Sequence, residues 1–281
     1  MSSISQDDIS LFISLAKKRR DIALGFYRRS FIARRLAARF LATKVSDLTE
    51  YTAVLKKDPS EWDKFLDNLS INVSEFFRDP EVFCVFEKVC VPSLIESRVG
   101  FAREAIRCWS CGCSYGEEPY SIAIAFQECL RRYENRRINL RVLATDIDKV
   151  ALNDGKRGRY ADSAVGNIDE TVLNRYFDKL EVDCEEENAK TWEVKDEVKE
   201  LVRFQEHNIL LDEPLRRVDV IFCRNVRIYF DRSKSKRILQ DLHNSLNPDG
   251  YMVLGKVESV SISLKHLFKA VDIRNRIYQK I

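Results

Sequence analysis

The sequence predicts an α/β fold in two parts: a small all-α N-terminal domain over residues 1–70 and an α/β domain over residues 71–281. Apolar residues at helical spacing fill the first part, and nothing in it has a strand pattern. From residue 105 on, short apolar strands alternate with helices, which favours a mostly parallel sheet. With 281 residues, 45% of them hydrophobic, the chain is long enough for two modest domains.

The N-terminal part contains two apolar stripes at helical spacing. The stripes are Ile9, Leu11, Phe12, Leu15 and Ala16, and then Phe31, Ile32, Leu36 and Phe40, with arginines opposite the second stripe. Ser46 is the predicted N-cap of a helix through Tyr51 and Leu55. Helical spacing continues through Trp62, Phe65, Leu66 and Leu69.

The second part alternates strands and helices. The predicted strands are Ala105–Ser110, Leu140–Thr145, Val218–Cys223 and Tyr251–Leu254. The predicted helices are Glu118–Arg131, one that begins at Asp148, and Ser233–Leu246, which the turn at 247–250 (NPDG) ends. This order predicts crossover connections between parallel strands.

Composition excludes several classes of protein. No apolar run reaches about 18 residues, so a membrane-spanning helix is not expected. The N-terminus has no basic segment followed by an apolar one, so we expect a cytoplasmic protein. The net charge is only +3, yet residues 17–39 hold nine Lys or Arg against the single acid Asp21.

Eight cysteines favour reduced thiols over disulfides in a chain of this length without a signal peptide. Cys108, Cys111 and Cys113 are close in sequence, as in some zinc sites. A structural zinc needs about four ligands, usually in two pairs, and the three histidines form none. We therefore expect buried small thiols and no metal.

Residues 109–118 (WSCGCSYGEE) combine a strand, two glycines and the start of a helix, an arrangement typical of nucleotide-type ligands. Only Gly112 and Gly116 are present and no Lys-Ser/Thr follows, so neither a dinucleotide fingerprint nor a P-loop is complete. Glu117 and Glu118 would repel a phosphate and suit a cationic, hydroxyl-bearing ligand. S-adenosylmethionine meets both needs. The alternative is a bare strand–helix turn with two acids at the helix dipole.

Other candidate residues follow the predicted strands. Asp146 could accept the ribose hydroxyls of an adenosine, or could cap a helix, a role that Asp148 could fill instead. In the segment 207–209, an Asn beside an apolar residue could hold an adenine edge. The run 222–230 ends a strand in Arg-Asn, and its aromatic residues could equally be core. Residues 72–79 are a polar-aromatic-Arg cluster or a packed hinge.

Six motifs occur in a fixed order, and together they carry a resemblance. They are NVSEFFRD (72–79), WSCGCSYGEEPYS (109–121), LATDID (143–148), KRGRY (156–160), FCRNVRIYF (222–230) and NPDGYMVLG (247–255). Over about residues 7–280 the chain resembles the chemotaxis receptor glutamate O-methyltransferases, the CheR family. The resemblance implies a helical domain joined to a class I S-adenosylmethionine-dependent methyltransferase (Rossmann-like) domain with a small β-subdomain. It also implies a cytoplasmic enzyme that methylates glutamates on the signalling helices of chemoreceptors and releases S-adenosyl-L-homocysteine.

The resemblance also implies roles for individual residues. Arg78 and Tyr229 match the pair near the transferred methyl, and Glu117 is an alternative to Glu118 as the acidic contact. The implied cofactor contacts are Asn72, Ser74, Arg78, Glu118, Asp146, Asn208, Ile209, Asn225 and Val226. The sequence departs from the family pattern at Ile71, Ser74, Cys111, Tyr115 and Lys256-Val257.

The chemistry of such a reaction agrees with the residues present. A glutamate carboxylate is ionised at pH 7, so its attack on a sulfonium methyl needs alignment more than a general base. The absence of a catalytic His or Cys dyad is then understandable, with orientation assigned to Tyr229 and charge steering to Arg78.

The basic stretch 17–39 could attract receptor helices that expose Glu, or could simply be a solvated helix face. Nucleic-acid binding is disfavoured because the pI is only about 8.3 and Phe31 and Phe40 face the predicted core. A related protein methyltransferase with a non-chemotaxis substrate and a non-catalytic cofactor-sensing scaffold remain as alternatives.

The stretch Asp178–Phe204 corresponds to the β-subdomain through which some family members bind a receptor's C-terminal pentapeptide. Trp192, Val194 and Val198 could form a small β-ribbon there, but the stretch has no glycine and is acidic at Glu185–Glu187. Without glycine, fewer tight turns are available. We therefore predict that this chain has no pentapeptide tether.

Overall fold

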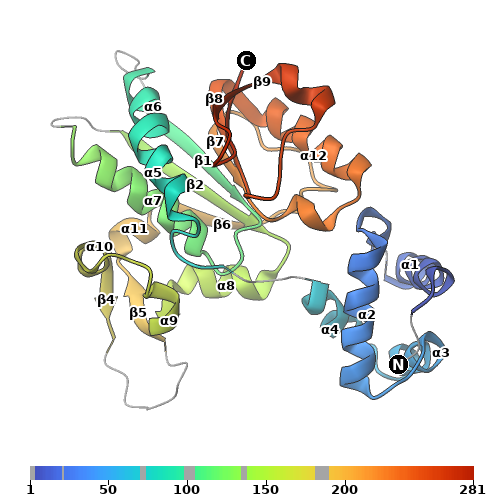
Figure 1. The fold of residues 1–281 in the computed structure, drawn as a ribbon. Coiled ribbons are helices and arrows are strands. Elements are labelled where there is room, and N and C mark those ends of the chain that lie inside the picture. The colour runs from blue at the N-terminus through green and yellow to red at the C-terminus, as the bar shows by residue number, and fades with distance from the viewer. Residues whose placement is uncertain (1–3, 21, 70–73, 98–104, 134–137, 181–189) are drawn as a thin grey trace. The chain divides into compact units, whose positions relative to one another are not determined.

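The structure is a computed structural model that describes residues 4–20, 22–69, 74–97, 105–133, 138–180 and 190–281. The chain divides into two compact units (Figure 1). The first comprises Met1–Ile71 with Ile228–Ser235, and the second comprises Asn72–Arg227 with Lys236–Ile281.

The first unit is a helical bundle. Its elements are α1 (Gln6–Arg20), the 3-10 turn η1 (Leu24–Phe26), α2 (Arg29–Thr43), α3 (Leu48–Lys57) and α4 (Glu61–Leu69). The ring of Phe12 stacks on Trp62 at 5.6 Å and meets Phe65 edge-on at 4.9 Å. The predicted stripes are buried except at Leu11, which is 61% exposed, and Leu15, which is half-buried. A strict helical stripe therefore overestimated the width of the buried face of α1.

The predicted N-cap of α3 was off by one residue. Asp47, not Ser46, is the cap: its carboxylate accepts a hydrogen bond from the backbone N–H of Glu50 at 2.9 Å. Ser46 precedes the cap, and its hydroxyl donates to the Glu50 carboxylate at 2.9 Å. Both residue types cap helices, but the negative charge of Asp also interacts favourably with the helix dipole.

Residues 228–235 pack with the helical unit although they follow a strand of the second unit in sequence. The backbone N–H of Arg28 donates to the carbonyl of Tyr229, and its Nε donates to the carbonyl of Phe230, both at 2.9 Å. Tyr27 and Phe230 form an isolated β-bridge. The Tyr229 ring lies 4.9 Å from the Phe31 ring. The sequence did not predict this association.

Among the described residues, the second unit contains a seven-stranded sheet in the order β6-β2-β1-β7-β8-β10-β9. The strands are β1 (Ala105–Cys111), β2 (Asn139–Asp146), β6 (Val202–Glu206), β7 (Val218–Cys223), β8 (Leu246–Leu254), β9 (Phe268–Asp272) and β10 (Ile277–Lys280). The first five in sheet order are parallel, and β10 is antiparallel to both of its neighbours. The order reverses between β1 and β7, which is where ligands bind in open α/β sheets.

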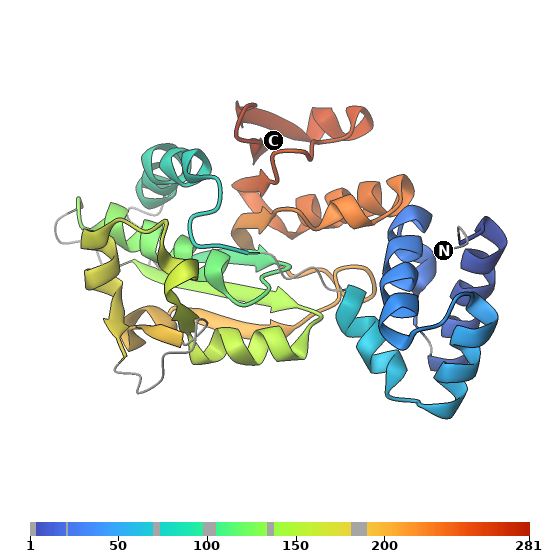
Figure 2. The ribbon, with the colours of Figure 1, turned by 60° about the horizontal axis from the view of Figure 1, so that its bottom comes forward.

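Helices cover both faces of this sheet. Helices α7 (Glu117–Leu130) and α8 (Lys149–Arg157) lie in crossovers that run toward β6, whereas α12 (Arg232–Ser245) lies in the crossover from β7 to β8. Because parallel crossovers are right-handed, α7 and α8 cover one face and α12 covers the other (Figure 2). The π-helical turn η2 (Phe86–Cys90) and α6 (Val91–Ser97) pack on α7. Helix α5 (Pro80–Val85) precedes them and contacts β7 through the rings of Phe83 and Phe222.

The predicted strands and helices of this unit are found within one or two residues, except that β8 begins at Leu246 rather than at Tyr251. The NPDG turn does end α12 at Ser245, as predicted, but its residues then join β8 through a register shift. Asp249 takes up this irregularity with φ of 59°. The 3-10 segment η4 (Ile262–Leu267) and the strands β9 and β10 complete the unit.

A second, antiparallel sheet has the order β3-β5-β4 among the described residues, from β3 (Arg159–Ala161), β4 (Phe177–Lys179) and β5 (Lys190–Val194). The short helices α9 (Asp162–Val165), α10 (Glu170–Tyr176) and α11 (Asp196–Lys199) accompany it. The predicted ribbon at Trp192 and Val194 is confirmed. Val198 lies in α11 and Phe204 in β6, so the predicted limit of the subdomain reached too far; Glu185–Glu187 lie outside the described residues.

No helix in the described part of the chain is both long and apolar enough to cross a membrane.

Candidate cofactor-binding and active site

The loop from β1 to α7 lies between a strand and a helix, as predicted. Gly112, Ser114 and Gly116 all have positive φ, at 74°, 51° and 97°. The N–H groups of Gly112 and Cys113 both donate to the carbonyl of Thr145, at 2.8 and 3.0 Å. A Cβ on Gly112 would lie 2.4 Å from Cγ2 of Val226, so the loop and the turn after β7 are in direct contact. Only glycine permits this approach.

Asp146 lies at the carboxyl end of β2 and orients this loop. Its Oδ2 accepts from the backbone N–H of Ser114 at 2.9 Å, and its Oδ1 accepts from the N–H of Asp148 at 3.1 Å. Each carboxylate oxygen keeps further acceptor capacity. Burial raises the pKa of Asp146, and the backbone hydrogen bonds partly offset this. Asp148 is the N-cap of α8, as proposed: it accepts from the N–H groups of Val150 and Ala151.

Glu118 points from the first turn of α7 toward the ends of β1 and β7. Its carboxylate accepts from the Ser110 hydroxyl at 2.7 Å and pairs with Arg224 at 3.4 Å. Burial raises the pKa of Glu118, while Arg224 acts to lower it. Glu117 is also buried, and its carbonyl accepts from the Ser121 hydroxyl.

Arg224 joins three segments that are far apart in sequence. Its guanidinium donates to the carbonyl of Arg78 at 2.8 Å, forms an ion pair with Asp79 and contacts Glu118, with only 2% of its side chain exposed. Lys256 holds the other oxygen of Asp79 at 2.9 Å. No local pattern indicates a role for Arg224 or Lys256, because the partners of both side chains lie more than 100 residues away.

The sequence patterns did not indicate Glu258 as a site residue. It is 4% exposed and follows β8. Its carboxylate accepts from the backbone N–H groups of Asn225, Arg227 and Gly255, at 2.8, 3.0 and 2.9 Å. It thereby fixes the turn after β7, in which Asn225 has φ of 59°. The available signal was an acid soon after a strand's carboxyl end.

The segment after β6 lies beside Asp146, whose carbonyl accepts from the N–H of His207 at 3.0 Å. Asn208 starts a turn: its Oδ1 accepts from the N–H of Leu210 at 3.0 Å, and its own N–H donates to Asp212 at 2.7 Å. Asn208 and Ile209 are both half-buried. The structure therefore brings Asn208 to the same sheet edge as Asp146.

The remaining predicted residues lie in different parts of the chain. Asn72 lies outside the described residues, and Ser74 is half-buried in the segment before Phe76. Tyr229 belongs to the first unit and Arg78 to the second. The proximity of Arg78 and Tyr229 stays a prediction.

Comparison with known proteins identifies the family. A family model for the CheR methyltransferase, SAM binding domain matches residues 72–277, and a model for the CheR methyltransferase, all-alpha domain matches residues 7–70. The chain belongs to the CheR methyltransferase family. It is therefore an S-adenosylmethionine-dependent methyltransferase.

The chain is also similar to individual proteins. The "Chemotaxis protein methyltransferase" of Borreliella burgdorferi is 31% identical over 97% of this chain and 96% of its own length. An "Uncharacterized 104.1 kDa protein in hypE 3'region" of Rhodobacter capsulatus is 30% identical over 91% of this chain, which spans 26% of that protein. The solved PKMT2 of Rickettsia typhi in complex with AdoHcy is 17% identical, with a TM-score of 0.34 over 60% of this chain and 25% of that one.

The residues of this CheR methyltransferase fit its cofactor. The hydroxyl oxygen of Ser114, in the glycine loop, is buried without a hydrogen-bond partner among the described residues. Asp146 and Glu118 place two carboxylates around the loop, which favours a cationic sulfonium ligand over a phosphate. The fit to the cofactor therefore rests on the carboxylates of Asp146 and Glu118 and on the Ser114 hydroxyl, which has no hydrogen-bond partner among the described residues.

The cysteines of the glycine loop region are buried and reduced. Burial raises the pKa of Cys108 and Cys113, and Cys111 lies beside Cys223. Within the described ranges, no three His, Cys, Asp or Glu residues are grouped as a metal site would need.

Proposed function

We propose that this methyltransferase transfers the methyl group of S-adenosylmethionine to glutamate carboxylates of chemoreceptors, the methyl-accepting chemotaxis proteins, and forms glutamate methyl esters for sensory adaptation. The observation that carries the proposal is the presence of both CheR domains in one chain, over residues 7–70 and 72–277. The receptor's signalling helices would make the cytoplasm the site of action.

The bound cofactor supplies an electrophilic methyl on a sulfonium. A glutamate oxygen forms a bond to the methyl carbon as the carbon–sulfur bond breaks, and the bonding electron pair stays on sulfur. The carboxylate loses its charge and the sulfonium becomes a neutral thioether, so no proton moves. The protein must align the carboxylate and exclude water.

The proposed roles follow from the positions of the side chains. Asp146 would accept the ribose hydroxyls, Asn208 and Ile209 would hold the adenine, and Glu118 would face the amino group. Asn225 and Val226 line the turn that touches Gly112. Asn72, Ser74 and Arg78 would complete the cofactor site from the segment before α5.

Arg78 would steer the incoming carboxylate, and Tyr229 would orient it. Arg78 is one of the positive charges that act on the Glu118 carboxylate. The Arg78 carbonyl is held by Arg224, so the backbone position of Arg78 is fixed. Too tight a pairing with Arg78 would reduce the nucleophilicity of the substrate carboxylate.

Only part of the basic stretch 17–39 is available to attract a receptor. Arg39 binds the buried Glu61 through two hydrogen bonds, at 2.8 and 2.7 Å, and is therefore structural. Arg34 is exposed on α2, and so are Lys18 and Arg19 on α1. These three residues form the proposed docking surface for receptor helices that expose Glu.

Nucleic acid is a poor candidate partner. Phe31 and Phe40 are buried, at 1% and 7% exposure, so neither can stack on a base. The core position predicted for both rings is confirmed.

Charge reversal tests the proposed docking surface. We expect Arg34→Glu to raise the KM for receptor several-fold, roughly two- to fivefold for one exposed charge, and to leave S-adenosylhomocysteine affinity unchanged. Lys56→Glu, an exposed reversal on α3, is the matched control. Arg35 is unsuitable because its guanidinium lies 5.1 Å from the Phe31 ring. Equal KM values for the two variants at low salt would mean that the exposed face of α2 is merely solvated and does not attract the receptor.

We further propose that substrate is found by direct docking, without the pentapeptide tether and without membrane insertion. The small sheet forms with no glycine between residues 178 and 204, but the segment 181–189 lies outside the described residues. Fluorescence anisotropy with a labelled receptor C-terminal pentapeptide tests this proposal. No binding is expected, and micromolar affinity would contradict it.

Methyl transfer to defined acceptors tests the main proposal. The protein is incubated with tritiated S-adenosylmethionine and receptor-containing membranes, or with nucleic acid. Base-labile label on receptor supports a carboxyl ester. Base-stable label on Lys, or label on nucleic acid, would contradict it.

A further inference from the structure

One part of the large sheet has no helix over it. Helices fill the crossovers that contain α7, α8 and α12, but residues 207–217, which lead from β6 to β7, form no helix. On the face opposite α7 and α8, the strands β1, β2 and β6 are therefore left to this loop. Side chains alternate along β1, so Arg107 and Trp109 point away from Ser110, which bonds to α7 through Glu118.

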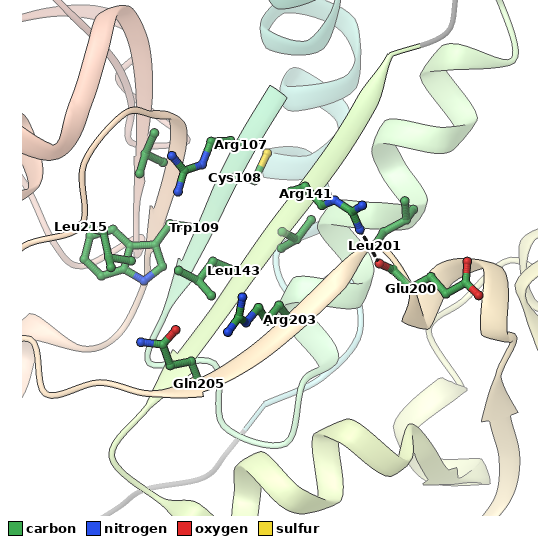
Figure 3. A pocket seen from close by; sticks show the side chains of 12 residues that line it. Arg107, Cys108, Trp109, Arg141, Leu143, Glu200, Leu201, Arg203, Gln205 and Leu215 are labelled. Atoms are coloured by element: carbon green, nitrogen blue, oxygen red, sulfur yellow. Dashed lines mark hydrogen bonds between the residues drawn. The ribbon is translucent and has the colours of Figure 1, made fainter. Parts of the chain in front are cut away.

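A cavity of about 510 Å³ occupies this face (Figure 3). Trp109, Leu143 and Leu215 give it apolar walls, while Arg107, Arg203 and Gln205 are exposed around it. Arg107 precedes Gly112 by five residues, roughly 16 Å along a strand at 3.3 Å per residue. The cavity is thus distinct from the proposed cofactor site at the carboxyl ends of the strands.

The cavity concentrates positive charge. Arg107 and Arg141 are register partners on adjacent strands, so their Cα atoms lie about 4.8 Å apart. Arg203 is the register partner of Leu143, two residues further along β2. None of the three guanidinium groups forms an ion pair within the described residues. Like charges so close together repel each other unless an anion lies between them.

The one acid in the lining does not supply that anion. Arg141 donates to the backbone carbonyl of Glu200 at 3.1 Å. The Glu200 carboxylate is directed away from Arg141 in Figure 3. The side chains of Arg107 and Arg203 reach the cavity from different strands.

We propose that this cavity binds an organic phosphate of nucleotide size. Planar guanidinium forks match phosphate oxygens with paired hydrogen bonds. The apolar walls at Trp109, Leu143 and Leu215 suit a ring system, and Gln205 offers an amide to its polar edge. The volume lies within the range of roughly 300–1,000 Å³ typical of small-ligand sites.

Calorimetric titration of the whole chain tests the proposal. The probes are GTP and inorganic triphosphate, because neither contains the adenosine proposed for the cofactor site. Saturating S-adenosylhomocysteine is present throughout, at low salt. We expect both probes to bind, GTP more tightly, and the affinity to fall as salt is added.

The variant Arg107→Gln with Arg203→Gln should weaken GTP binding by about tenfold or more, as expected for two charge-assisted contacts. Both side chains are exposed, and unchanged S-adenosylhomocysteine affinity shows that the fold is intact. Lys265→Gln with Lys269→Gln removes two exposed charges elsewhere in the same unit and should change GTP affinity by less than about twofold.

Several results would overturn the proposal. They are absent GTP binding, equal affinity in the double arginine variant, or GTP binding only when S-adenosylhomocysteine is omitted. Binding of a polyglutamate peptide, but not of either phosphate probe, would assign the surface to an acidic polypeptide instead. The proposal does not depend on which protein is methylated.

Discussion

Replacing Asp146 probes the cofactor site most sharply, because this side chain has two tasks. It holds the glycine loop through the Ser114 N–H at 2.9 Å, and it is proposed to accept two ribose hydroxyls. Hydrogen bonds to a charged group contribute about 1.5–3 kcal/mol each, although not additively. We therefore expect Asp146→Ala to cost about 2–3 kcal/mol of cofactor binding, which is roughly 30- to 150-fold in Kd.

Calorimetry with S-adenosylhomocysteine measures this loss. Asp148→Ala is the matched control, because it removes the N-cap of α8. It should cost about 1 kcal/mol of stability but leave the affinity nearly unchanged. An affinity of Asp146→Ala within about twofold of the wild type would refute the assignment of the ribose contact.

The same site predicts a pH dependence. Burial raises the pKa of Asp146, and the proposed contact needs the ionised carboxylate. The affinity for S-adenosylhomocysteine should be highest near neutral pH, where Asp146 is ionised. It should fall as the pH drops through the pKa of Asp146, which lies above the ordinary value of about 3.9. Asp146→Asn should lose this dependence. A wild-type profile retained in Asp146→Asn would assign the titration to another group.

Three further substitutions have defined outcomes. Glu61→Gln removes the carboxylate charge that pairs with Arg39 at 2.7 Å, where the Glu61 side chain is 2% exposed. The free energy of unfolding, measured in urea, should fall by about 3 kcal/mol, and a loss below about 0.5 kcal/mol would contradict a buried pair. Gly112→Ala places a Cβ 2.4 Å from Val226 at a backbone φ of 74°. The affinity for S-adenosylhomocysteine, measured by calorimetry, should therefore fall about tenfold or more, and unchanged affinity would argue against a role of the loop in cofactor binding. Tyr229→Phe should slow methyl transfer and spare cofactor affinity, because the ring still packs on Phe31; an unaltered rate would remove Tyr229 from the mechanism.

Local signals predicted several elements around the candidate site. Gly112 and Gly116 follow a strand and precede a helix, as predicted, and the structure shows that both have positive φ. Asp146 lies at a strand's carboxyl end, beside a second acid that caps the next helix. In such cases the signal itself, a strand end, a glycine or a helix start, lies within a few positions, although the contacts it leads to can be distant in sequence.

Long-range pairs were not predictable from the same patterns. Arg224 and Asp79 are separated by 145 residues, and neither has a local signal that points to the other. Arg39 was assigned to a solvent-facing stripe, but its partner Glu61 lies on another helix. Residues 228–235 follow a strand of the second unit and yet pack on Tyr27 and Phe31, which periodicity cannot show.

The chemistry of the transferred methyl group tests the central claim most directly. The reaction with receptor is run to completion, and S-adenosylhomocysteine is quantified together with the methanol released by mild base. A glutamate methyl ester yields about one methanol per S-adenosylhomocysteine, because each transfer makes one base-labile bond. Formation of S-adenosylhomocysteine with no methanol released would place the methyl on nitrogen or carbon and would contradict carboxylate methylation.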